Sequence, residues 1–151
     1  MDKRFDWLVP VILVLAIAAT EMAVDMYIPS LPLLSHYFHV EEEIVALTLS
    51  GHLFALFISG TIYGPLSDRL GRRFTLILGM TIFTFGAFLG GMAPTMEFLI
   101  GARFIQGLGG SVSWIVGIAM VKDLYQEERC SRILSTMYMV IAFAPGIAPI
   151  I

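Results

Sequence analysis

Four ionisable side chains interrupt otherwise apolar stretches of this 151-residue sequence, and they are the first candidates for chemistry. They are Glu21, Asp25, His52 and Arg103. Ionisable groups are costly in hydrocarbon, so each is expected to face a bundle interior or a water-filled cavity. Glu21 and Asp25 are spaced to share one face of a helix. Burial disfavours a charged carboxylate whereas a nearby arginine favours it, and a group balanced in this way can exchange a proton.

The depths of these groups predict that they meet in one polar pocket. At 1.5 Å per residue, Glu21, His52 and Arg103 each lie roughly 12 Å below the outer ends of their stretches. Asp25 lies roughly 6 Å below its own. A buried ion pair that only joins two helices is the alternative interpretation of the charges. For His52 a hydrogen-bonded packing role is the simpler interpretation. Arg103 is expected to adjust the pKa of a nearby carboxylate or to fix the geometry of the site, because arginine does not itself titrate.

Five apolar runs must position these groups. Hydrophobic residues make up 58% of the chain and charged residues 14%, against roughly 25% charged in a soluble domain. The surplus apolar surface is predicted to face lipid, where the backbone must be helical. The predicted spans cover residues 7–28, 44–63, 74–92, 98–121 and 133–151. The fold class is therefore an all-α integral membrane protein of about five transmembrane helices.

Basic residues alternate between the connections of these runs. They are Lys3 and Arg4 before the first run, Arg69, Arg72 and Arg73 after the second, and Lys122, Arg129 and Arg132 after the fourth. The connections 29–43 and 93–97 contain no Lys or Arg. We therefore expect a multi-pass protein of the inner cell membrane with its N-terminus in the cytoplasm. A cleaved signal peptide is the competing interpretation of the first run, since residues 16–18 resemble a cleavage site.

Glycine and proline mark expected helix contacts, turns and breaks. Residues 107–111 are glycine-rich but lack the strand and lysine of a phosphate-binding loop, so helix packing is the preferred interpretation. Residues 64–73 are expected to form a tight, densely charged turn in which glycines permit unusual backbone geometry. Pro145 and Pro149 each remove a backbone donor, so a kink or break is expected in the fifth helix.

Several function classes are excluded by the same sequence. The runs contain no nucleophile with a positioned base and no cluster of metal ligands, so neither an enzyme nor a metal site is predicted. A net charge of −3 predicts no nucleic-acid partner. The single cysteine, Cys130, cannot form an internal disulfide.

The motifs of the chain resemble those of the major facilitator superfamily. Its signature loop between helices two and three is similar to the set Gly64, Leu66, Ser67, Asp68, Arg69, Gly71, Arg72 and Arg73. Residues 103–109 resemble the helix-four motif of its proton antiporters. Residues 25–32 resemble the end of helix one in drug–proton antiporters of the bicyclomycin-resistance type. Residues 144–149 are similar to the start of the antiporter motif of helix five, with alanine before the first proline where glycine is usual.

The resemblance implies a protein of twelve helices in two halves, with alternating access around a midplane site. Residues 1–151 would be a partial N-terminal six-helix bundle. In it, Asp25 would be the helix-one acid of a proton and substrate site, and Arg103 with Gln106 would be its helix-four members. Glu21 and His52 join this predicted site on the depth argument alone.

Two further motifs acquire roles from the resemblance. The cytoplasmic gate would comprise Gly64, Asp68, Arg69, Gly71, Arg72 and Arg73, with Arg72 paired to Asp123 on helix four. The helix-five motif would comprise Pro145, Gly146 and Pro149.

The predicted function is efflux of small amphipathic or cationic compounds in exchange for protons, driven by the proton gradient without a cofactor. The expected partners are membrane lipid and a missing C-terminal half, because the fifth run reaches the last residue without a polar stop. Two alternatives stay open: a small multispan protein that acts by assembling with a partner through buried polar groups, and a nonfunctional truncation product.

Overall fold

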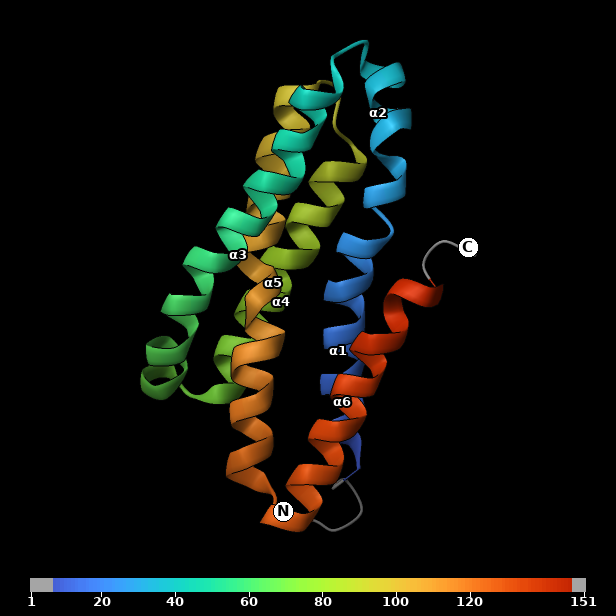
Figure 1. The fold of residues 1–151 in the computed structure, drawn as a ribbon. Coiled ribbons are helices and arrows are strands. Elements are labelled where there is room, and N and C mark those ends of the chain that lie inside the picture. The colour runs from blue at the N-terminus through green and yellow to red at the C-terminus, as the bar shows by residue number, and fades with distance from the viewer. Residues whose placement is uncertain (1–6, 148–151) are drawn as a thin grey trace.

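The computed structural model describes residues 7–147 as a bundle of helices (Figure 1). In chain order the elements are α1 (Leu8–Asp25), the 3-10 turn η2 (Ile28–Ser30), α2 (Leu31–Phe38), α3 (Glu42–Leu70), α4 (Arg72–Gly91), α5 (Met96–Leu124) and α6 (Glu127–Ile147). All regular structure in the described range is helical, so the predicted all-α class is confirmed.

Four stretches between residues 7 and 147 are long and apolar enough to cross a membrane. They are Leu8–Phe38, Glu42–Leu70, Arg72–Gly91 and Met96–Leu124. They correspond to the first four predicted spans. Helix α6 is not one of these four, although it covers most of the fifth predicted run, and it begins at Glu127. Residues 148–151 of that run lie outside the described residues.

Successive long helices alternate in direction (Figure 1). The start of α1, the α3–α4 joint and the α5–α6 joint lie at one end of the bundle, and the α2–α3 and α4–α5 joints lie at the other. Arg69, Arg72, Arg73 and Lys122 therefore gather at the same end, which we call the basic end. The alternation of basic residues along the sequence thus becomes a single basic end in space.

The predicted turn over residues 64–73 is wrong in its length. Helix α3 continues through Gly64 and Pro65 to Leu70, and Gly71 alone separates it from α4. Gly71 has φ +91°, a conformation that favours glycine because it has no Cβ. The 29 residues of α3 span roughly 43 Å. This exceeds roughly 30 Å of hydrocarbon, so the charged last turns can reach water without leaving the helix.

The connection after α1 is also more helical than predicted. Pro29 and Pro32 lie at the second positions of η2 and α2. Proline is tolerated there because the first N–H groups of a helix have no intrahelical partner. Each proline therefore lies in the first turn of a new helical segment. The C-terminal cap of α2 is His39, with φ +55°.

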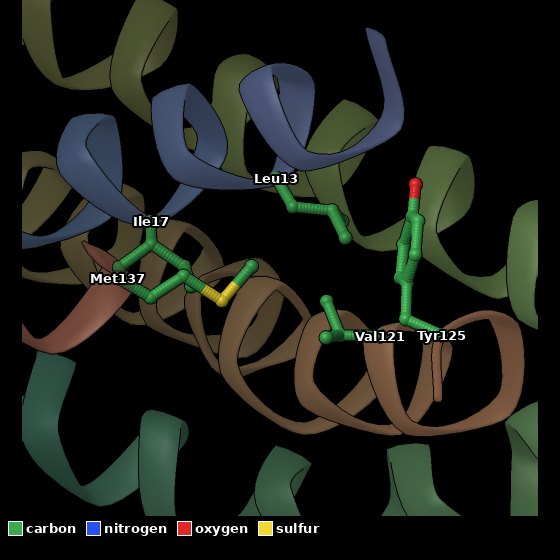
Figure 2. Close-up of a cluster of buried hydrophobic side chains, with 5 residues drawn as sticks. All are labelled: Leu13, Ile17, Val121, Tyr125 and Met137. Atoms are coloured by element: carbon green, nitrogen blue, oxygen red, sulfur yellow. The ribbon is translucent and has the colours of Figure 1, made fainter. Parts of the chain in front are cut away.

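A cluster of buried apolar side chains holds α1 and α6 against the basic-end half of α5 (Figure 2). Leu13 and Ile17 come from α1, and Met137 comes from α6. They meet Val121 of α5 and Tyr125, which follows that helix. Hydrophobic contact of this kind fixes the two outer helices without any charge.

Glycines let helix α5 approach α3 and α4 more closely than residues with a Cβ would allow. A Cβ on Gly107 would overlap the carbonyl oxygen of His52 on α3. A Cβ on Gly109 would overlap the backbone of Phe83 on α4, and one on Gly86 would lie 2.6 Å from the Cα of Gln106. Small residues permit such contacts between membrane helices. These contacts support the helix-packing interpretation of residues 107–111.

Candidate functional site

Arg103 lies on α5 among groups that carry no negative charge. Its guanidinium carbon is 3.4 Å from the centroid of the Tyr27 ring. Its Nη1 donates to the carbonyl oxygen of Ala23 at 3.2 Å and to Oε1 of Gln106 at 2.9 Å. The hydroxyl of Tyr27 is in turn 2.6 Å from Oγ1 of Thr48 on α3. The arginine is therefore held by the end of α1 and by its own helix.

The two carboxylates of α1 do not pair with this arginine. Within the described residues, Asp25 is half-buried and its side chain makes no hydrogen bond or ion pair. Glu21 accepts a hydrogen bond from Nε1 of Trp114, which lies further along α5, at 2.6 Å. The place beside the guanidinium is occupied by the Tyr27 ring. Depth along the helices thus predicted neighbouring groups but not their partners.

A pocket of about 480 Å³ lies against Arg103 and Gln106, and we call it the Arg103 pocket. Its walls include the aromatic rings of Tyr27, Tyr37 and Phe38 and the small residues Ala87, Gly90 and Gly91 of α4. Neither Asp25, Glu21 nor His52 lines it. The predicted four-group pocket therefore contains Arg103, with Gln106, and leaves the other three charged or titratable groups nearby but outside.

His52 is buried with one polar atom satisfied. It is 2% exposed, and its Nδ1 donates to the carbonyl oxygen of Arg103 at 3.1 Å. Its Nε2 has no hydrogen-bond partner among residues 7–147. An unpaired buried polar atom costs about 1–3 kcal/mol. A small void shared with Tyr27 and Arg103 lies beside it. The hydrogen-bonded packing role predicted for His52 is consistent with this geometry.

The predicted pairing of Arg72 with Asp123 is present at the basic end. Arg72 Nε donates to Oδ2 of Asp123 at 2.9 Å, and its Nη1 is 2.7 Å from Oδ1 of Asp68. The same nitrogen donates to Oγ of Ser67. One arginine therefore joins the ends of α3, α4 and α5. Arg69 and Arg73 form no ion pair with any residue in the described part of the chain.

The helix-five motif falls only partly within the described range. Helix α6 continues through Pro145 and Gly146 to Ile147, so the predicted break does not occur before that residue. Pro149 lies outside the described residues.

Sequence reasoning missed a set of hydroxyl pairs between helices. Thr20 Oγ1 lies 3.0 Å from Oγ of Ser113, which joins α1 to α5. Ser59 Oγ lies 2.7 Å from Oγ of Ser111, which joins α3 to α5. Single serines and threonines are common in apolar helices and carry no charge that would mark them. Their one available signal was the nearby glycines, which bring the backbones close enough for short side chains to meet.

The fold and the site define a helical membrane protein with a polar pocket set into an apolar bundle. The family described as Major Facilitator Superfamily matches residues 13–151. The chain belongs to this superfamily of transporters, which confirms the resemblance drawn from its motifs.

Several relatives are named for drug resistance. The chain is 32% identical to "Multidrug resistance protein D" of Escherichia coli, over 92% of this chain and 35% of that protein. It is 30% identical to "Multidrug resistance protein MdtL" of Vibrio parahaemolyticus, over 85% of this chain and 33% of that protein. It is 29% identical to a "Bicyclomycin resistance protein homolog" of Haemophilus influenzae, over 85% of this chain and 32% of that protein. The chain therefore spans about a third of the length of these relatives.

Proposed function

We propose that this chain is the N-terminal part of a proton-coupled antiporter that exports drugs or other small amphipathic molecules from the cell. One observation carries the proposal: the Arg103 pocket, whose volume is about 480 Å³. Ligand sites are concave, mostly apolar and carry few polar groups, and this pocket has that character in a chain whose relatives are named for multidrug resistance.

Asp25 is the proposed proton carrier. It lies on α1 within one turn of Tyr27, which stacks on Arg103, and no ion pair fixes its charge among the described residues. A carboxylate without a fixed partner can alternate between its two protonation states as the environment changes. Glu21, held by Trp114, is proposed to contribute polarity to the same region of α1 and α5. The energy source is the proton gradient, with no bound cofactor.

The basic end is proposed to face the cytoplasm and to act as a gate. There Arg72 joins Asp68 of α3 to Asp123 of α5. Breaking and remaking these bonds would let α3 and α5 move relative to each other. The positive-inside pattern supports the cytoplasmic assignment and a location in the inner membrane.

The substitution Asp25→Asn tests the proposed coupling. Compound-driven proton movement is measured in inverted vesicles that contain the whole transporter at matched amounts. We expect Asp25→Asn to reduce proton movement at least tenfold while compound binding persists, because the amide cannot carry a proton. The control is Glu43→Gln, the same chemical change at an exposed position in the first turn of α3. Full proton movement in Asp25→Asn, or equal loss in both variants, would reject the assignment.

A further inference from the structure

We propose that the Arg103 pocket binds the anionic end of an amphipathic aromatic molecule, with the carboxylate on Arg103 and Gln106 and the apolar body between Tyr27, Tyr37, Phe38 and the small residues of α4. This inference rests on the proposed function in taking the bound molecule to be the one transported. Its chemical class is an organic anion, such as a carboxylate or phosphate, attached to an apolar body.

The charge of the pocket is the first argument. Among the described residues that line the pocket, Arg103 is the one charged side chain. Its hydrogen bonds go to a carbonyl oxygen and an amide oxygen, both neutral, and the Tyr27 ring is also neutral. A guanidinium has five N–H donors, and carboxylates match its planar geometry with two parallel bonds. A positive charge without an acid in an apolar bundle is costly, and a bound anion offsets that cost.

The arrangement of Gln106 is the second argument. Gln106 is 5% exposed and lies one turn along α5 from Arg103. Its Oε1 accepts from Arg103, which leaves the two hydrogens of its amide nitrogen as donors. Both residues line the same pocket. Two donor groups thus meet at one place, as an anion requires.

The walls of the pocket are the third argument, and they favour a flat apolar body. The Tyr37 and Phe38 rings pack edge to face with centroids 4.9 Å apart, and Tyr27 lies against the guanidinium. On α4, the lining residues Ala87, Gly90 and Gly91 have little or no side chain. A Cβ placed on Gly91 would meet nothing within 4 Å, so the space beside it is open.

The same charge disfavours a purely cationic molecule in this pocket. The two acidic groups of α1 do not line it: Asp25 is outside, and Glu21 is bonded to Trp114. A cation would therefore meet the guanidinium without a compensating carboxylate. The inference narrows the predicted amphipathic or cationic substrates to those with an anionic or zwitterionic end.

Three probes with one aromatic body test the inference: 1-naphthoate, the neutral 1-naphthamide and the cationic 1-naphthylmethylammonium. Their binding is measured by calorimetry on the protein purified from its own membrane into nanodiscs of phosphatidylcholine. We expect 1-naphthoate to bind at least tenfold more tightly than 1-naphthamide, and the cation to bind most weakly. Equal affinities of the anion and the amide, or tighter binding of the cation, would overturn the proposal.

Two variants assign the binding to this pocket. Arg103→Gln is expected to reduce 1-naphthoate affinity to that of 1-naphthamide and to leave 1-naphthamide unchanged. Lys122→Gln, at an exposed position of the basic end, controls for loss of charge and should change neither. Gly91→Val adds a side chain at a lining position where a Cβ meets nothing within 4 Å, so it should narrow the pocket and weaken both probes at least tenfold. Its control is Gly101→Val on α5, where a Cβ also meets nothing within 4 Å. Similar affinities in the two valine variants would place binding elsewhere and overturn the proposal.

A second set of nanodiscs identifies the source of the anion. Nanodiscs with phosphatidylglycerol present an anionic lipid phosphate. If a lipid headgroup is the occupant, this lipid lowers 1-naphthoate affinity in the native protein and leaves Arg103→Gln unchanged. If a soluble molecule is the occupant, 1-naphthoate affinity is the same in both membranes. The transport assay on Asp25→Asn is scored separately, so loss of coupling with intact 1-naphthoate binding separates the two proposals.

Discussion

Arg72 and Arg103 are the same residue type in two regions of one bundle, and they are held in different ways. Arg72, at the basic end, bonds to two carboxylates, with 55% and 64% of their side chains exposed. Arg103, on α5 beside the pocket, is held by a tyrosine ring, a backbone carbonyl and a glutamine amide. Two carboxylates neutralise the charge of Arg72 at a position where water can also solvate it. Neutral partners hold the second in position without neutralising its positive charge.

The largest expected loss of stability comes from disturbing the close contact between α4 and α5 near Arg103. Gly86 lies against Gln106, so a Cβ in Gly86→Ala would lie 2.6 Å from the Cα of that residue and force α4 from α5. Overpacking of this kind costs roughly 2–3 kcal/mol. The control is Gly64→Ala on α3, where a Cβ meets nothing within 4 Å, and this variant should not destabilise the protein. Both are measured by unfolding in detergent, and equal stabilities would mean that the Arg103 region does not depend on close packing.

An intermediate effect is expected where a ring supports Arg103. Tyr27→Leu removes both the aromatic face and the hydroxyl, and it should lower the free energy of unfolding by about 1.5–2 kcal/mol, of which roughly 0.5–1 kcal/mol is the lost cation–π contact. Tyr27→Phe keeps the face and loses the hydroxyl bond to Thr48, which is worth about 1 kcal/mol. Because the leucine variant loses both, it should be the less stable of the two in the same unfolding assay. A phenylalanine variant as unstable as the leucine variant would assign the effect to the hydroxyl alone.

The smallest effect is expected at the basic end. Asp123→Asn leaves Arg72 its second carboxylate, Asp68. An exposed ion pair is worth roughly 0–1 kcal/mol, so we expect a loss of about 0.5 kcal/mol in unfolding at low salt. At 1 M salt the Debye length falls to about 3 Å, and the difference from the native protein should disappear. A loss that persists at high salt would show that Arg72 is shielded from water, and the contrast with Arg103 would fail.

The sequence predicted the features that polarity alone controls. The apolar runs located the four membrane-crossing stretches. The bond between Arg72 and Asp123 was predicted in another way, from the resemblance of the loop motif to a known family. The helix ends were predicted less well. Residues 64–70 include the charged Asp68 and Arg69 and are nevertheless helical, and helical structure resumes around Pro29. Polarity marks where a chain meets water, whereas a helix can continue well past that boundary.

The surroundings of Arg103 escaped prediction for a different reason. Reasoning from charges looks for an opposite charge, and Asp25 and Glu21 were the available acids. The partners found are a ring, a carbonyl and an amide, which no charge pattern distinguishes from their neighbours. Their identity depends on how α1 bends at its end and how closely α5 approaches. These are properties of the packed bundle, and no single helix contains them.

The neutral partners of Arg103 also bear on how the protein is made. Thr20 and Ser113 each bond to a carbonyl of their own helix, so these hydroxyls can enter lipid before any neighbour is present. Arg103 instead needs Ala23 and Tyr27, which belong to an earlier segment of the chain. Synthesis runs from the N-terminus, so the groups that receive this cation are made before the cation itself. Because α1 precedes α5 in the chain, the residues that contact Arg103 are already synthesised when this charged side chain enters the membrane.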